Sequence, residues 1–215
     1  LLKMLKQFYE KLLPKQGVYC VSGIDKAGGI TNRYTETFDE IYVLAERHKK
    51  KELNVYVTPA TFKQFSRKAE EAVAVKSFFI DLDVGAEKAA TKKGYLTKEE
   101  AYDNLLIWVE EKELPPPIIL DSGTGIHAYW AFEEDVEVAE WKLYAEKFKA
   151  FCLQDLYIDP APTADVARIM RCPDTYNYKT QPPSKATILS DCEGHSAFSA
   201  VEDVHVNGFR EGWHH

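Results

Sequence analysis

Apolar side chains in the first third of the chain recur at spacings that alternate between helix and strand. The apolar positions of residues 1–13 follow a helical period and stop at Pro14, as expected for a helix that a proline ends. The Gly28-Gly29 pair predicts a turn between the two strands of a hairpin. The expected elements are helices at 1–13 and 38–50 and strands at 17–23, 30–37 and 53–57. We therefore predict an N-terminal α/β subdomain over residues 1–70.

The remainder of the chain alternates strands and helices in the order β-α-β-β-α-β. Thr97-Lys-Glu-Glu100 has the pattern of a capping box at a helix start, and Pro115-Pro-Pro117 ends that helix. This order closes as a four-stranded antiparallel sheet with both helices on one face. The expected elements are strands at about 75–83, 118–120, 126–132 and 166–170 and helices at about 97–113 and 137–153. We predict an α+β fold, with an RRM-like four-stranded sheet in a subdomain over 71–215 and the N-terminal α/β unit packed against it.

Two carboxylates stand at the end of the most apolar of these strands. Asp81 and Asp83 follow Phe78-Phe-Ile80, and because strand side chains alternate, both acids point to the same face. Like charges on one face repel unless a cation lies between them, and Mg²⁺ or Mn²⁺ prefers such oxygen ligands. The pattern is short, so a strand that ends in a solvated polar loop remains the alternative for the pair alone.

The predicted topology brings further polar side chains to this pair. In the split βαβ arrangement the first and third strands are adjacent at the centre, and the fourth flanks the first. His127 opens the third strand and Asp165 opens the fourth. We therefore expect Asp81, Asp83, His127 and Asp165 to converge on the sheet face that the helices leave uncovered. Taken alone, His127 could equally be a satisfied core histidine beside Tyr129.

Net charge is unevenly distributed along the chain. The whole sequence carries a formal charge of −7, yet residues 1–76 hold 14 Lys and Arg against 9 Asp and Glu. The negative net charge argues against a protein that coats DNA. The basic first third favours a polyanionic ligand that contacts only this part of the surface. No apolar run is long enough to span a membrane and no signal peptide opens the chain, so we expect a cytoplasmic protein without a membrane partner. The start at Leu1 suggests a fragment of a longer protein.

The four cysteines show no metal-binding or disulfide spacing. They are widely separated and form no C-x-x-C pair, so we expect reduced thiols. Cys192 and His195 could be half of a zinc site, but two ligands do not make one, and no zinc is expected. The cysteines are Cys20, Cys152, Cys172 and Cys192.

Three blocks in order give the chain a resemblance to a known family. They are Phe78-Phe-Ile-Asp-Leu-Asp83, Ser122-Gly-Thr-Gly-Ile-His-Ala-Tyr-Trp130 and Asp165-Val-Ala-Arg-Ile-Met-Arg-Cys-Pro-Asp-Thr-Tyr-Asn-Tyr-Lys179. With these blocks, residues 70–180 and the preceding α/β unit resemble the archaeo-eukaryotic primase superfamily, and within it the primase-polymerases of plasmids, phages and other mobile elements. The third block departs from the family at Asp174, where glycine is usual; aspartate can also hold a turn.

The resemblance implies a DNA-directed nucleotidyltransferase that uses two ions of Mg²⁺ or Mn²⁺. Asp81, Asp83 and Asp165 would hold the metals, with Asp159 as an alternative third ligand. His127 would act with them as a catalytic residue and contact the triphosphate. The implied partners are a single-stranded DNA template, a primer and a (d)NTP, with a fused or associated helicase. The nucleotide-binding residues would be Ser122, Gly123, His127, Arg168, Arg171 and Lys179.

Other interpretations of the same residues remain. A non-catalytic RRM-like nucleic-acid-binding module for replication initiation would want aromatic rings where Asp81 and Asp83 stand, and would bind without metal. A phosphatase with a D-x-D nucleophile would want a threonine soon afterwards, where Val84-Gly-Ala86 stands. The hairpin arm Thr31-Asn-Arg-Tyr-Thr35 could bind a single strand of nucleic acid, although exposed hairpins often have this composition.

Overall fold

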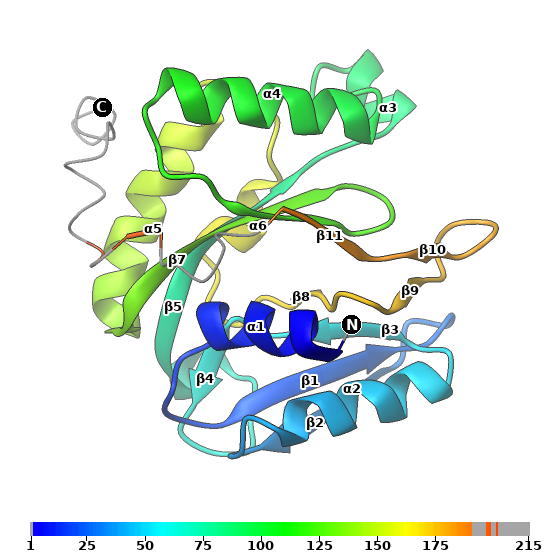
Figure 1. Ribbon diagram of the computed structural model, residues 1–215, viewed down its shortest axis with the longest axis vertical. Helices are drawn as coiled ribbons and strands as arrows, with labels where there is room; N and C mark the ends of the chain where they lie inside the picture. Colours follow the sequence, from blue (N-terminus) through cyan, green and yellow to red (C-terminus); the bar gives the residue numbers. More distant parts are fainter. Residues whose placement is uncertain (1, 191–196, 199–200, 202–215) are drawn as a thin grey trace.

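The computed structural model describes residues 2–190, 197–198 and 201, and contains two main antiparallel sheets and the two-stranded sheet β10-β9 (Figure 1). The four-stranded main sheet, which we call the N-terminal sheet, has the order β2-β1-β3-β8. Helix α2 packs on one of its faces. The expected hairpin, helix and strand of the first third are confirmed. The elements are β1 Tyr19–Ile24, β2 Ile30–Thr35, α2 Glu40–Lys50, β3 Asn54–Val57 and β8 Met170–Arg171.

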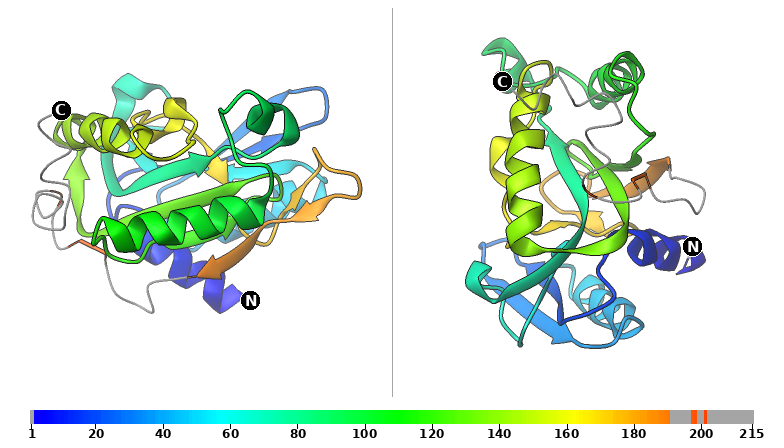
Figure 2. Two further views of the ribbon diagram at one scale, coloured as in Figure 1. Left: turned by 90° about the horizontal axis from the view of Figure 1, so that it is seen from above. Right: turned by 90° about the vertical axis from the view of Figure 1, so that its left-hand side faces the viewer.

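The second sheet, which we call the large sheet, has the order β11-β6-β7-β5-β4. Helices α4 and α5 lie on one side of it (Figure 2). The capping box at the start of α4 forms, because Thr97 Oγ1 accepts a hydrogen bond from the N–H of Glu100 at 3.1 Å. The strands and helices are β4 Ala60–Phe62, β5 Ala72–Leu82, α4 Lys98–Glu111, β6 Ile118–Asp121, β7 Ile126–Glu137, α5 Val138–Leu153 and β11 Thr187–Ser190.

The remaining elements are short, apart from the first helix. Helix α1 lies between the two sheets in Figure 1, and its Phe8 contacts Tyr129 of β7 edge to face at 5.6 Å. These elements are α1 Leu2–Leu12, a 3-10 turn at Ala69–Glu71, α3 Ala86–Ala90, α6 Pro160–Thr163, β9 Tyr176–Asn177 and β10 Ser184–Lys185. Within the described residues no helix combines the length and apolarity needed to cross a bilayer.

The α+β class is confirmed, but the predicted fourth strand of the RRM-like sheet is wrong. Residues 166–169 form no strand, because Asp165 Oδ1 accepts the N–H of Ala167 at 3.0 Å and holds a turn. Met170 and Arg171 then pair with β3 of the N-terminal sheet. The place beside β5 is taken by β4, and β11 adds a fifth strand at the other edge. The expected boundary at residue 70 therefore does not separate the two sheets.

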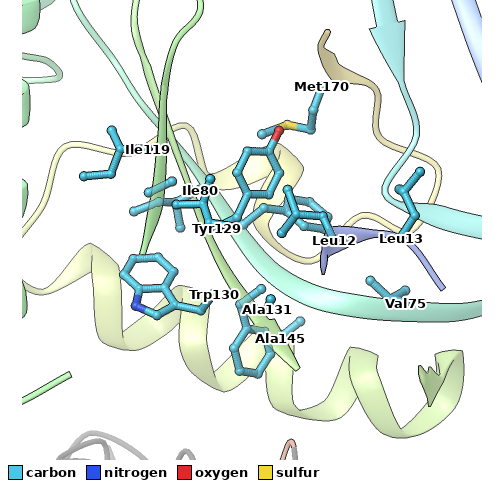
Figure 3. Packing of buried hydrophobic residues seen from close by; sticks show 14 of the residues in the cluster. Leu12, Leu13, Val75, Ile80, Ile119, Tyr129, Trp130, Ala131, Ala145 and Met170 are labelled. Carbon is cyan, nitrogen blue, oxygen red and sulfur yellow. The ribbon is translucent and has the colours of Figure 1, made fainter. Parts of the chain in front are cut away.

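A continuous apolar core joins the two sheets. Figure 3 shows Leu12 and Leu13 beside Tyr129 and Met170, on the opposite side of β7 from Trp130. The alternation of side chains along β7 explains this, since Tyr129 and Trp130 project from opposite faces. The sheet face that was expected to be uncovered is therefore lined by α1 and the N-terminal sheet, which leave a cavity near the ends of β5 and β7.

Three of the four cysteines lie in the described part of the chain. Cys20, Cys152 and Cys172 are buried free thiols, as expected. Cys192 and His195, considered as half of a zinc site, lie outside the described residues.

Candidate active site

Asp81 and His127 lie directly opposite each other near the ends of β5 and β7. The antiparallel register pairs the two residues, and Asp81 Oδ1 is 3.6 Å from His127 Nε2. Directly opposed residues project from the same sheet face. The structure therefore brings this acid and this histidine together, as the strand order implied.

Asp83 follows directly after β5 and is compensated by a cation from the next helix. Its backbone N–H donates to the carbonyl of Tyr157 at 3.0 Å, which holds the residue beyond the strand end. Its Oδ1 accepts a hydrogen bond from Lys88 Nζ at 2.8 Å. The chain reverses into α3 at Gly85, whose φ of 148° is a conformation that favours glycine.

The electrostatics around Asp81 favour a bound cation. Burial, and then the neighbouring carboxylates of Asp83 and Asp159, raise the pKa of Asp81 to about 7. Lys88 and Arg168 oppose this shift without cancelling it. An additional positive charge between the acids would relieve this cost.

Asp159, rather than Asp165, stands next to the acid pair. The N–H of Asp159 donates to the carbonyl of Asp81 at 2.8 Å, and its Oδ2 is 3.5 Å from Arg168. Asp165 instead caps its own turn through Ala167. Neither acid is among the described residues that line the cavity, but of the two it is Asp159 whose charge raises the pKa of Asp81. The geometry thus favours the alternative third carboxylate that the sequence left open.

His127 is a neutral imidazole with an unused ring nitrogen. It is 7% exposed, and burial, with help from the cations Arg171 and Arg168, lowers its pKa to about 3. Its contact with Asp81 is therefore not an ion pair. Among the described residues, Nδ1 has no hydrogen-bond partner although it is buried. A buried polar atom without a partner is costly, which favours a ligand that would satisfy it.

The Ser122–Gly125 segment forms a tight loop beside Asp81. The N–H of Gly125 donates to Ser122 Oγ at 3.1 Å, while the carbonyl of Ser122 accepts from Asn177 Nδ2 at 3.0 Å. Gly123 has a φ of 96°, and a Cβ added there would lie 2.8 Å from the Cβ of Asn177. Only glycine fits this position, and the loop's backbone stays close to the acids.

Arg171 is a buried cation held by two residues of β3. Its Nη1 donates to Asn54 Oδ1 at 2.9 Å, and its guanidinium carbon lies 4.4 Å from the centre of the Tyr56 ring. Within the described residues no carboxylate lies within 4.0 Å of it. Burial lowers the pKa of Arg171, which shows the cost of this uncompensated charge.

These side chains line a cavity of about 390 Å³ between the two sheets. Asp81 and Asp83 supply its negative charge, and basic side chains surround them. A nucleoside triphosphate bound to divalent cations needs this combination of acids and bases. The cavity-lining residues that the sequence predicted are Asp81, Asp83, Ser122, His127, Arg168, Arg171 and Lys179.

Comparisons with known proteins find likeness only at the level of structure. No protein-family model matches this sequence, and no curated protein matches it. Among solved structures, the AEP domain of the cyanophage S-2L primase-polymerase superposes with a TM-score of 0.63 at 16% identity, over 89% of each chain. The chain has the fold of a primase-polymerase domain.

Two further structures share this primase-polymerase fold. The catalytic domain of primase RepB' in complex with initiator DNA gives a TM-score of 0.59 at 15% identity, over 98% of this chain and 92% of that one. The polymerase domain of Mycobacterium tuberculosis Ligase D in complex with DNA gives a TM-score of 0.51 at 13% identity, over 98% of this chain and 88% of that one. The predicted resemblance is confirmed for the fold.

Some residues of the site in this fold were not predicted from the sequence. Lys88 lies in a short polar helix that carries no recognisable motif. Asn54 and Tyr56 contact Arg171 because two strands that are distant in the sequence pair with each other. Asn177 stood within the third block, beside Lys179, and could have been singled out there. Its side chain fixes the Ser122 loop.

The acid pair of this site can hold a divalent cation, and a third acid lies nearby. No group of three His, Cys, Asp or Glu side chains in the described part of the chain is already arranged as a metal centre. However, the Asp83 carboxylate binds the ammonium of Lys88, and burial, followed by the charges of Asp83 and Asp159, raises the pKa of Asp81. Oxygen ligands of this kind suit Mg²⁺ or Mn²⁺.

Proposed function

We propose that this chain is the catalytic domain of a DNA primase-polymerase, which transfers nucleotides from (d)NTPs to a growing strand under the direction of a DNA template. The observation that supports this most directly is the cavity between the two sheets. It combines the acid pair of Asp81 and Asp83 with Arg168, Arg171 and Lys179. An acid pair alone would serve many reactions, but the surrounding cations select a substrate rich in negative charge.

The carboxylates define the reacting end of the substrate. Asp81 and Asp83 would hold the two metal ions, with Asp159 as the third carboxylate in preference to Asp165. When bound there, Mg²⁺ or Mn²⁺ would lower the pKa of the attacking 3′-hydroxyl and stabilise charge on the triphosphate. The α-phosphorus would therefore lie closest to Asp81 and Asp83.

The basic residues define where the triphosphate lies. Arg171, kept in place by Asn54 and Tyr56, can donate paired hydrogen bonds to phosphate oxygens. Arg168 and Lys179 add charge from the same side of the cavity. Neutral His127 lines the cavity and can donate one hydrogen bond to a β- or γ-phosphate oxygen through its protonated ring nitrogen.

The Ser122 loop completes the phosphate site with backbone groups. Because Gly123 has no side chain, the chain turns closely against Asn177. The N–H groups of Ser122, Gly123 and Gly125 donate to protein acceptors, so the N–H of Thr124 is the one that can donate to a phosphate oxygen. Ser122 orders this loop through its hydroxyl contacts with Gly125.

Two of the structures with this fold are recorded as complexes with DNA, which supports a DNA template and primer as partners here. The phage primase-polymerase and the RepB' primase likewise support a role in replicating a phage or other mobile element. A helicase partner remains a prediction. A metal-independent RRM-like binder is the alternative, but acids rather than aromatic rings occupy the positions that face the cavity.

A primer-extension assay tests this proposal. With Mg²⁺ or Mn²⁺, a labelled primer on a DNA template should be extended by the wild-type chain, and a template without primer shows whether it also starts strands. Asp81→Ala and Asp83→Ala should each abolish extension while thermal unfolding remains cooperative. Asp103→Ala, which alters an acid of α4 that is not among the residues lining the cavity, serves as the matched control. Full activity of either active-site variant would exclude the mechanism.

A further inference from the structure

An aromatic pair lies on the N-terminal sheet outside the catalytic cavity. The rings of Tyr34, on β2, and Phe65, in the loop after β4, are stacked with centroids 5.7 Å apart and planes inclined by 30°. Phe65 is 62% exposed, the highest value among the large hydrophobic side chains of the described residues. We call these two residues the Tyr34–Phe65 pair. Its outer ring offers an apolar π-face to solvent, which is costly without a ligand.

The chain segments that carry this pair are basic. Residues 26–35 and 59–68 contain five Lys or Arg and no Asp or Glu, although the chain as a whole is acidic. Arg33 is next to Tyr34 on β2 and therefore projects from the opposite face of the sheet, whereas Arg67 follows Phe65 by two residues. Burial raises the pKa of the Tyr34 phenol, and the charge of the Arg67 guanidinium opposes that shift. The charge around the pair therefore complements a polyanion.

Arg67 also connects the pair with the catalytic cavity. Its Nη1 donates to the carbonyl of Ala167 at 2.7 Å, and the next residue, Arg168, lines the cavity. No carboxylate of the described residues lies within 4.0 Å of the Arg67 guanidinium. The phosphates of one nucleic-acid strand could therefore contact Arg168 and then Arg67, because both arginines lie beside the same segment of the protein backbone.

The register of the N-terminal sheet gives a second connection. Arg171 lies opposite Tyr56, Tyr56 opposite Ser22, and Ser22 opposite Asn32. The four side chains therefore form one row on one face of β8, β3, β1 and β2. Figure 1 shows these four strands as part of the N-terminal sheet. Tyr34 is two residues along β2 from Asn32 and projects from the same face. The aromatic pair therefore stands on the same sheet face as Arg171 of the cavity, at the opposite edge of the sheet.

We propose that the Tyr34–Phe65 pair stacks an unpaired base of the single-stranded DNA template outside the catalytic cavity, with Arg67 contacting an adjacent phosphate. This inference rests on the proposed function for the identity of the strand. Aromatic rings interleaved with cations bind single strands without regard to sequence, because every base has a π-face. An uncharged protein partner would leave the basic segments uncompensated, so the charge favours nucleic acid.

Binding of a fluorescein-labelled single-stranded oligodeoxynucleotide of mixed sequence, followed by anisotropy without metal or nucleotide, tests the inference. Phe65→Leu removes the ring and keeps an apolar side chain, and should weaken Kd on the order of tenfold. Phe65→Trp should retain or improve affinity. The control is Leu143→Ala on α5, an exposed apolar residue at 57%, which should bind as the wild type does. A 2-aminopurine base in the oligonucleotide should be quenched by the wild type and by Phe65→Trp but not by Phe65→Leu.

The outcomes separate this inference from the proposed function. If the Kd of Phe65→Leu lies within twofold of the wild-type Kd, the proposal that this pair stacks a base is wrong, whether or not primers are extended. If Phe65→Leu binds normally while Phe65→Ala does not, the contact is apolar and stacking is excluded. If the wild-type chain extends no primer with either metal, the proposed function fails, and the oligonucleotide titration still reports on the aromatic pair. Thermal unfolding of each variant checks that the exposed substitutions leave the fold intact.

Discussion

The ammonium of Lys88 lies 2.8 Å from Asp83 Oδ1, whereas the carboxylate of Asp81, two residues earlier, lies 3.6 Å from Nε2 of the neutral His127. The acid pair is therefore compensated on one side by the chain's own cation. Lys88 is 53% exposed in its side chain and lies on the short helix α3, so it can withdraw from Asp83 without disturbing the core. A metal ion that binds Asp83 would have to compete with this ammonium.

Replacing Lys88 should consequently strengthen divalent cation binding. Two unit charges about 4 Å apart in a water-like environment interact by about 1 kcal/mol, so Lys88→Met should tighten Mn²⁺ binding about fivefold in the absence of nucleotide. Titration followed by the electron paramagnetic resonance signal of free Mn²⁺ measures this. Lys93→Met, which removes a nearby exposed charge that has no ion pair with any described carboxylate, serves as the control for net charge. Unchanged or weaker binding in Lys88→Met would show that the ammonium does not occupy a cation position.

The identity of the third carboxylate can be decided with two isosteric variants. Asp159→Asn should lower nucleotide incorporation on the order of 100-fold or more, because it removes a negative charge beside Asp81. Asp165→Asn should leave most of the activity, since an amide oxygen can still accept the N–H of Ala167. In each variant the amide oxygen can still accept the backbone hydrogen bond that the aspartate accepts. Single-turnover extension rates therefore report the effect of removing the negative charge. The reverse order of effects would restore Asp165 as the third ligand.

The proximity of Asp81 and His127 was predictable because it depends on two long strands whose hydrophobic patterns are clear. The apolar run of β5 and the sequence of β7 fix which residues face the core, and a central antiparallel pair then determines what lies opposite. The capping box of α4 is equally local. Such features depend on the residues of one segment or of two adjacent strands.

The position of β8 was not predictable in the same way. It has only two residues, too few to carry a hydrophobic period, and its partner β3 is more than 100 residues away. The rule for split βαβ units assumes that all four strands belong to one sheet. Here the turn at Asp165 directs the chain into the N-terminal sheet instead. The contacts of Arg171 with Asn54 and Tyr56 depend on this exchange, and so they were missed as well.

Gly123 and Gly28 form a matched pair for measuring how tightly the phosphate loop is packed. Their φ angles are 96° and 90°, so alanine causes similar backbone strain at both. Only at Gly123 would the new Cβ meet another residue, at 2.8 Å from Asn177 Cβ, whereas Gly28 has open space. Gly123→Ala should therefore lower the free energy of unfolding by about 1 to 3 kcal/mol more than Gly28→Ala, as measured by urea denaturation. Equal losses would mean that the loop yields freely at Asn177.

His48 should make the stability of the N-terminal sheet depend on pH. This residue of α2 is 3% exposed, and its Nε2 lies 3.2 Å from the carbonyl of Val21. Burial lowers its pKa from 6.5, and the nearby cations Arg33 and Lys51 lower it further, against the opposing effect of the Val21 hydrogen bond. The unfolded chain therefore takes up a proton at higher pH than the folded protein does. The stability that neutral His48 contributes is present above pH 6.5 and is lost as the pH falls through 6.5 towards the lower folded pKa.

The variant His48→Gln isolates this effect. Glutamine can still donate a hydrogen bond to the Val21 carbonyl but does not titrate. His127, with a lowered pKa, and Asp81, with a raised pKa, act in opposite directions on acidification, but both groups are common to wild type and variant. The free energy of unfolding of the wild type should therefore fall relative to that of the variant between pH 7.5 and pH 5.5, as measured by urea denaturation at each pH. Parallel changes in the two proteins would show that His48 keeps its ordinary pKa in the fold, and the pH dependence would then belong to other groups.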